Sequence, residues 1–128
     1  MNFFIFIAAL ITFVALIGHF TMGRNAYLKP VLDADIDLVP KKVMQSVFHY
    51  MSVFLVLSLF ILLAGSHRSC PMYDYVHNMI RFMGMAYGLF AITQFVIALT
   101  SGIPGGVFKI FQWLFWALIS VFAIIGTL

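Results

Sequence analysis

The sequence contains very little charge. Only 9% of its 128 residues are Asp, Glu, Lys or Arg, whereas about a quarter of the residues in a soluble domain are charged. Glutamate is absent, and the four acidic residues are all aspartates that lie outside the long apolar runs. This scarcity excludes an ordinary soluble domain. The net charge of +3 comes from residues scattered beside the apolar runs, without the basic patch that nucleic-acid binding requires.

Several catalytic patterns are also missing. The single cysteine, Cys70, excludes an internal disulfide and a Cys-x-x-Cys redox pair. The chain has neither a Gly-x-Ser-x-Gly elbow nor a phosphate-binding glycine loop. With no acid inside the apolar runs to support a nucleophile, these absences favour a protein without enzymatic activity of its own.

The sequence does have long hydrophobic runs: 64% of the residues are hydrophobic and the mean hydropathy is +1.10. We expect membrane spans at about 3–22, 43–65, 80–100 and 104–127, each close to the ~20 residues needed to cross a bilayer. Spans in lipid must satisfy their own backbone hydrogen bonds, so these runs are expected to be helices. The sequence therefore predicts an all-α, integral membrane four-helix bundle that forms one domain over residues 1–128.

Basic residues beside the spans predict the orientation. Positive residues are enriched on the cytoplasmic side of membrane proteins. Five of them are expected at one end of the bundle and two at the other, which places the 23–42 linker in the cytoplasm and both termini outside, in the inner (plasma) membrane. The first group is Arg24, Lys29, Lys41, Lys42 and Lys109, and the second is Arg68 and Arg81.

Each predicted span carries one narrow stripe of small or polar residues. The members are three or four positions apart, so each stripe forms one face of a helix. We expect these faces to turn toward the other helices. The stripes are Ala8, Thr12, Ala15 and His19; Gln45, His49 and Ser52; Gly84, Gly88, Ala91, Gln94 and Ala98; and Lys109, Gln112, Trp116, Ser120 and Ala123.

The most polar stripe residues, His19, His49, Gln94 and Gln112, fall at a similar depth and predict a buried polar layer. Polar groups in a membrane interior need partners, so interhelical hydrogen bonds are the favoured interpretation. A proton or ion path, which Lys109 could also line, is an alternative because histidine titrates near neutral pH. A metal or haem site on His19 and His49 is a third, although two histidines alone are an incomplete ligand set.

Two further motifs allow alternatives. Gly84-x-x-x-Gly88, continued by Ala91, permits close helix approach; packing within the chain is favoured over a homo-oligomer contact. Between the second and third spans, His67 and His77 lie near Cys70 and Asp74. This spacing matches a metal site weakly, and solvated residues at the membrane interface are the favoured interpretation.

Three short stretches resemble the YwdK-like family of small bacterial four-span membrane proteins of unknown function. They are Gly18-His19, Phe48-His49, and Pro104-Gly105-Gly106 followed by Trp113. The resemblance implies a four-span architecture and no known activity. It also implies that His19 and His49 are the positions to test.

Taken alone, the sequence predicts a structural or accessory subunit of a membrane complex without a cofactor, in contact with lipid and with other subunits or copies of itself. A small oligomeric channel or transporter for protons or small ions is the main alternative. A redox component that binds haem or a transition metal is a further one.

Overall fold

The structure is a computed structural model, and it describes residues 1–67 and 72–128. The described residues form helices joined by short connections, without strands, which confirms the predicted all-α bundle. Three helical segments are long and apolar enough to cross a membrane, Phe3–Asp33, Leu38–Ser66 and Tyr73–Thr100, and a shorter apolar helix covers Gln112–Ile125. The elements are α1 (Phe3–Gly18), η1 (His19–Leu28), α2 (Lys29–Asp33), α3 (Leu38–Ser66), α4 (Tyr73–Thr100), α5 (Gly106–Lys109) and α6 (Gln112–Ile125).

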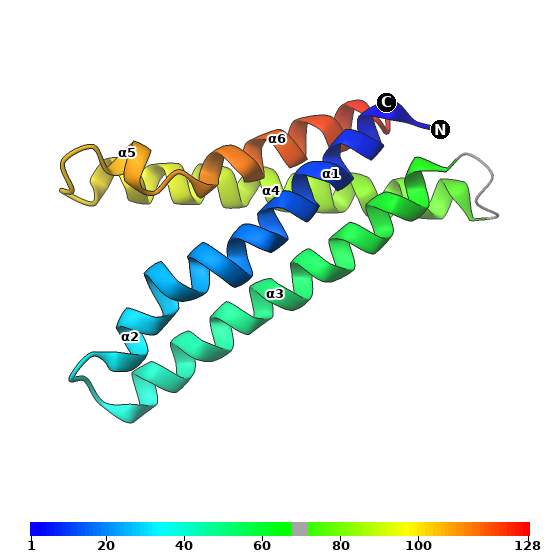
Figure 1. The fold of residues 1–128 in the computed structure, drawn as a ribbon. Helices are drawn as coiled ribbons and strands as arrows, with labels where there is room; N and C mark the ends of the chain where they lie inside the picture. The colour runs from blue at the N-terminus through cyan, green and yellow to red at the C-terminus, as the bar shows by residue number, and fades with distance from the viewer. Residues whose placement is uncertain (68–71) are drawn as a thin grey trace.

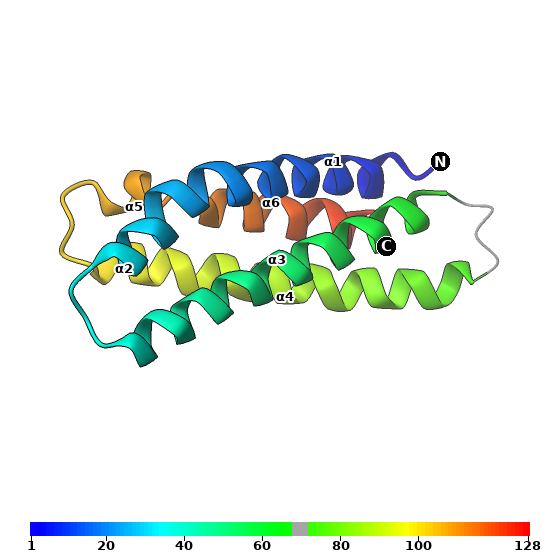
Figure 2. The same cartoon turned by 60° about the horizontal axis from the view of Figure 1, so that its bottom comes forward.

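The helices form two antiparallel hairpins. The first consists of α1, η1 and α2 with α3, and the second consists of α4 with α5 and α6 (Figure 1). The hairpins meet at the end that holds both termini, where α1 packs on α6. From there they diverge toward the end that holds α2 and α5 (Figure 1). Figure 2 shows α1 and α6 running along each other from a second direction. We call the two ends of the molecule the closed end and the open end.

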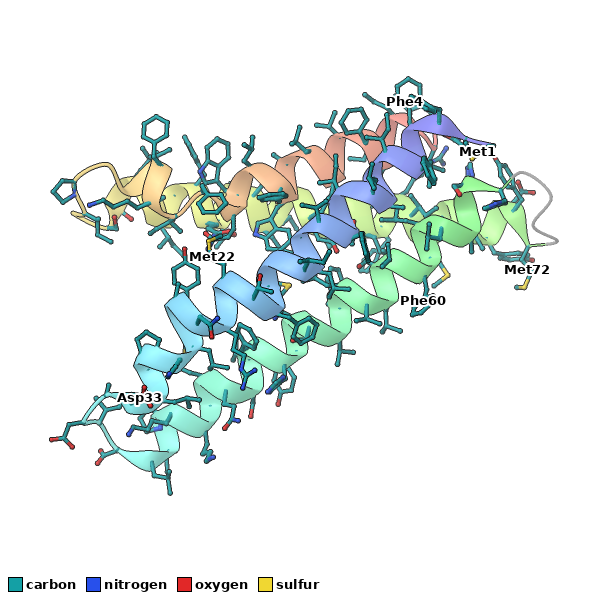
Figure 3. All side chains as sticks on the ribbon, in the orientation of Figure 1. Met1, Phe4, Met22, Asp33, Phe60 and Met72 are labelled. Atoms are coloured by element: carbon teal, nitrogen blue, oxygen red, sulfur yellow. The ribbon has the colours of Figure 1, made fainter. Side chains whose placement is uncertain are left out.

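The hydrophobic core lies at the closed end. It is built from the N-terminal part of α1, the C-terminal part of α3, the N-terminal part of α4 and the C-terminal part of α6. Phe4 and Phe60, in contrast, point away from the bundle (Figure 3). Burial of the shared apolar faces therefore holds the two hairpins together at one end only. The largest fully buried apolar side chains are Ile5, Leu55, Leu62, Ile80, Tyr87 and Ile119.

Asn2 ties the closed end together. Its side-chain amide donates to the Gly126 carbonyl oxygen at 2.6 Å, and its backbone N–H donates to the Ser66 carbonyl oxygen at 2.7 Å. Its Oδ1 accepts from the Ile5 N–H at 3.3 Å and caps α1. Because helix ends leave backbone groups unpaired, one residue here satisfies such groups from three helices.

The predicted glycine face of α4 packs against α6 within the chain. A Cβ added at Gly84 would lie 3.0 Å from Ile124 Cγ1, and one added at Gly88 would lie 3.0 Å from Ser120 Oγ. Ala91 is buried one turn further along. The small residues thus let two helices approach closely, as the favoured interpretation of the Gly-x-x-x-Gly motif expects.

The first helical segment is longer than expected. It continues without a break to Asp33 instead of ending near residue 22, so the expected linker 23–42 shortens to residues 34–37. Pro30 does not stop it, although a proline inside a continuous helix removes one backbone hydrogen bond; it lies where the π-helix changes to α2. Residues His19–Leu28 form a π-helix, a form with i→i+5 hydrogen bonds that is rare and is frequent at functional sites.

The other helices also differ from the expected bounds. Helices α3 and α4 begin at Leu38 and Tyr73, several residues earlier than expected. The last span, expected as one helix over 104–127, is interrupted at residues 110–111, where Ile110 leaves helical geometry with φ −108° and ψ 63°. The Trp113 indole N–H donates to the Val107 carbonyl oxygen at 3.0 Å. This bond satisfies a backbone acceptor at the interruption, which makes the break tolerable in an apolar segment.

Candidate functional site

A cavity of about 360 Å³ lies at the open end, between the two hairpins. Its volume is within the range of small-molecule sites, about 300–1,000 Å³. The segment α1–η1 lines it over residues 14–27, α3 over 48–51, α4 at Gln94, and Phe111 together with α6 over 111–116. Each hairpin therefore supplies one wall. Met22 lies in the space between the hairpins (Figure 3). The lining residues are Val14, Ala15, Gly18, His19, Met22, Gly23, Tyr27, Phe48, Met51, Gln94, Phe111, Gln112, Phe115 and Trp116.

His19 fastens the first hairpin. It begins the π-helix, and its Nε2 lies 2.9 Å from Ser52 Oγ and 3.2 Å from the Phe48 carbonyl oxygen. Its ring is stacked on the Phe48 ring, with centroids 3.9 Å apart and planes at 15°. These contacts hold the imidazole in one orientation against α3. The expected polar layer thus includes His19, bonded to the neighbouring helix.

The contacts of His19 Nε2 assign the proton of the neutral ring to that nitrogen. A carbonyl oxygen only accepts, so Nε2 facing the Phe48 oxygen must carry a proton. Ser52 Oγ donates to that same carbonyl at 3.1 Å and is left to accept from Nε2–H. A neutral imidazole that carries its proton on Nε2 has a lone pair on Nδ1. His19 Nδ1 is therefore a hydrogen-bond acceptor, and it lies 3.8 Å from the Cβ position of Gly23, another lining residue.

Gln94 and Gln112 fasten the second hairpin through a chain of hydrogen bonds. The Trp116 indole N–H donates to Gln94 Oε1 at 2.8 Å, and Gln94 Nε2 donates to Gln112 Oε1 at 3.0 Å. Because an indole N–H only donates, it fixes the orientation of the Gln94 amide and, through it, that of Gln112. The last group in this series of hydrogen bonds is Gln112 Nε2. In the described residues, no protein acceptor binds either of its two protons.

His49 and Lys109 do not belong to this arrangement. Both side chains are exposed, and neither lines the cavity. The expectation that Gln45, His49 and Ser52 share the inward face of α3 is corrected: Phe48 and Ser52 face α1, and His49 lies one position further round the helix. The Phe48 ring contacts both imidazoles. It stacks face to face on His19, and it lies edge-on to His49 with ring centroids 5.7 Å apart. Lys109 ends the short helix α5, and its side chain is exposed.

The part that the π-helix plays in the cavity could not be predicted from the residue pattern. Gly23 and Tyr27 line the cavity, although the expected linker 23–42 includes both, and so does Met22 at the end of the expected first span. Phe48 was missed as well, because a phenylalanine among many apolar residues gives no signal of its own. Trp116 was placed on the inward stripe correctly, but its role as the donor that orients Gln94 depends on coordinates.

The group near the closed end does not form a metal site in the described residues. His67 Nδ1 lies 3.0 Å from the Leu63 carbonyl oxygen, and the His77 ring packs on Tyr73 with centroids 3.9 Å apart. Cys70 lies outside the described residues. Within residues 1–67 and 72–128, no three His, Cys, Asp or Glu side chains are placed to hold a metal ion.

No protein-family model, no curated protein and no solved structure matches this chain. The apolar helices therefore define its class, that of a membrane protein.

Proposed function

We propose that this chain is a structural or accessory subunit of a membrane complex in the inner membrane, without enzymatic activity of its own. The observation that supports this role most is that the polar side chains form hydrogen bonds between helices of the same hairpin. His19 bonds to Phe48 and Ser52 within the first hairpin, and Gln94 bonds to Gln112 and Trp116 within the second. The polar groups are thus engaged in fixing helices against each other.

The expected strength of these hydrogen bonds agrees with a structural role for the polar side chains. An interhelical hydrogen bond in a membrane contributes about 0.6 kcal/mol on average and seldom more than about 2 kcal/mol. Bonds of this strength set the register of two helices without dominating stability. The outer flanks of α3, α4 and α6 carry exposed apolar side chains, among them Phe60, Leu89 and Val121 at 65%, 64% and 50% exposure. These flanks are the surface that the chain offers to lipid and to neighbouring subunits.

Photo-crosslinking in native membranes tests the accessory role. We expect a photoreactive phenylalanine analogue at Phe60, Leu89 or Val121 to give at least one discrete adduct with a different membrane protein. The same analogue at fully buried Leu62 is the control and should give none. Adducts with lipid and with the chain itself at all three exposed positions would contradict the proposal.

We also propose that the open end faces the cytoplasm, since it holds Arg24, Lys29, Lys41, Lys42 and Lys109 while both termini lie at the closed end. In a Cys70→Ser background, a cysteine replacing Leu128 should react with an impermeant maleimide in intact cells. A cysteine replacing Asp35 should react with the same maleimide only after the cells are permeabilised. Both positions are exposed, so the reverse labelling pattern would overturn this orientation.

A further inference from the structure

The cavity at the open end is open on one side. Three of its lining side chains, Val14, Met22 and Tyr27, remain 48%, 45% and 42% exposed. On that side the wall is not covered by protein. All three residues belong to the segment Phe3–Asp33, which is long and apolar enough to cross a membrane, so a molecule dissolved in the bilayer can reach the space between the hairpins from this side.

The remaining walls are mainly aromatic, with Ala15 and Met51 beside the rings. Phe48, Phe111, Phe115 and Trp116 line the cavity together with Tyr27. Flat rings stack favourably on such side chains, offset or edge-to-face. An aliphatic chain gains no such preference, so the walls favour a planar ring over an acyl chain.

Two polar groups in the cavity walls are available to a ligand, and they are complementary. His19 Nδ1 in the first hairpin is an acceptor, because Nε2 holds the proton between Phe48 and Ser52. Gln112 Nε2 in the second hairpin is a donor, because its Oε1 already accepts from Gln94. A ligand that satisfies both must donate one hydrogen bond and accept another.

The backbone leaves room beside His19. A Cβ added at Gly18 would meet no heavy atom within 4 Å, and Gly18 lines the cavity. The π-helix starts at the next residue. Such segments occur frequently at functional sites, and here the segment turns His19, Met22, Gly23 and Tyr27 toward the same space.

From these features we propose that the cavity binds the ring of a lipid-soluble quinol. One ring hydroxyl donates to His19 Nδ1, another ring oxygen accepts from the Gln112 amide, the ring lies among the aromatic walls, and the hydrophobic tail leaves between the hairpins into lipid. The oxidised quinone lacks the hydroxyl proton and cannot satisfy His19 Nδ1. The site therefore prefers the reduced form. This inference goes beyond the accessory role and does not depend on it.

Tryptophan fluorescence tests the proposal directly. The chain has two tryptophans, and only Trp116 lines the cavity, so a Trp113→Phe background makes Trp116 the sole reporter. We expect a decyl-tailed ubiquinol analogue, titrated into nanodiscs under reducing conditions, to change Trp116 emission saturably. Loss of one hydrogen bond corresponds to about a tenfold change in affinity. The oxidised analogue should therefore bind about tenfold more weakly.

Three variants separate the site from a general membrane effect. Gly18→Leu fills the open space and should abolish binding, and Gln112→Met removes the donor and should weaken it about tenfold. His49→Ala changes an imidazole outside the cavity and should leave the titration unchanged. The proposal would be overturned if Trp116 emission did not saturate with the quinol analogue. Identical titration curves for all three variants, or a change in emission with palmitate equal to that with the quinol, would also overturn it. A failed crosslinking experiment would not affect this result, so the two proposals fail separately.

Discussion

Replacing Tyr87 with alanine is expected to lower the free energy of unfolding by about 3–5 kcal/mol, the usual cost of removing a large buried aromatic side chain. Tyr87 is fully buried, and its ring packs on Phe54, Phe90 and Trp116 at centroid distances of 5.3, 6.1 and 5.7 Å. It therefore joins α3, α4 and α6. Alanine would leave a void that neither lipid nor water can fill well. Steric-trap unfolding in bicelles measures the loss.

A Tyr87→Phe variant is the matched control. The Tyr87 hydroxyl is buried beside the Ser58 hydroxyl, and neither has the geometry of a full hydrogen bond to any group in the described residues. Removing an unsatisfied buried hydroxyl relieves a penalty of up to about 1–3 kcal/mol. We expect the phenylalanine variant to be as stable as the original chain or more stable. Equal losses in both variants would show that the hydroxyl, and not the packing of the ring, matters at this position.

Replacing Gly84 with leucine is expected to cost at least about 1–3 kcal/mol, the typical penalty for overpacking a close interface. A Cβ alone would stand 3.0 Å from Ile124 Cγ1, 3.4 Å from Ala123 Cβ and 3.5 Å from the Ser120 carbonyl oxygen. The remaining atoms of leucine have no space unless α6 moves away from α4. The same unfolding measurement, together with loss of a disulfide engineered across the two helices, reports the separation.

Gly18→Leu is the control for this experiment, because a Cβ at that position meets no heavy atom within 4 Å. Both glycines lie in helical backbone, so the change in helix propensity is the same. We expect Gly18→Leu to unfold at nearly the same free energy as the original chain. If the two variants were equally destabilised, glycine flexibility rather than close helix contact would explain the role of Gly84.

Much of the fold could be predicted because the responsible residues are chemically distinctive. Low charge and long apolar runs indicate membrane helices, and Gly84 and Gly88 mark the face of α4 that approaches α6. Gln94 and Gln112 are polar residues at a similar depth in adjacent helices joined by a short turn, so their contact followed from span lengths alone. The indole of Trp116 was on the same stripe, and its bond to Gln94 adds a partner to that contact.

Other parts could not be predicted. The inward face of α3 was misplaced because Ser52 fits two stripes, one with His49 and one with Phe48, and polarity favoured the first. The structure selects the second, because the His49 side chain is exposed and needs no buried partner. The π-helix over His19–Leu28 changes the hydrogen-bond register by one residue, which has no sequence signature. Without it, Gly23 and Tyr27 were assigned to a linker and the cavity was not expected.

The bonds of Asn2 have a consequence for biogenesis. Its side-chain amide reaches the carbonyl of Gly126, 124 positions away. During translation, the first hairpin is inserted long before that carbonyl has been synthesised. Until α6 has been synthesised, α1 therefore lacks this partner. The termini are thus joined last, and a stalled nascent chain exposes the face of α1 that the finished protein covers.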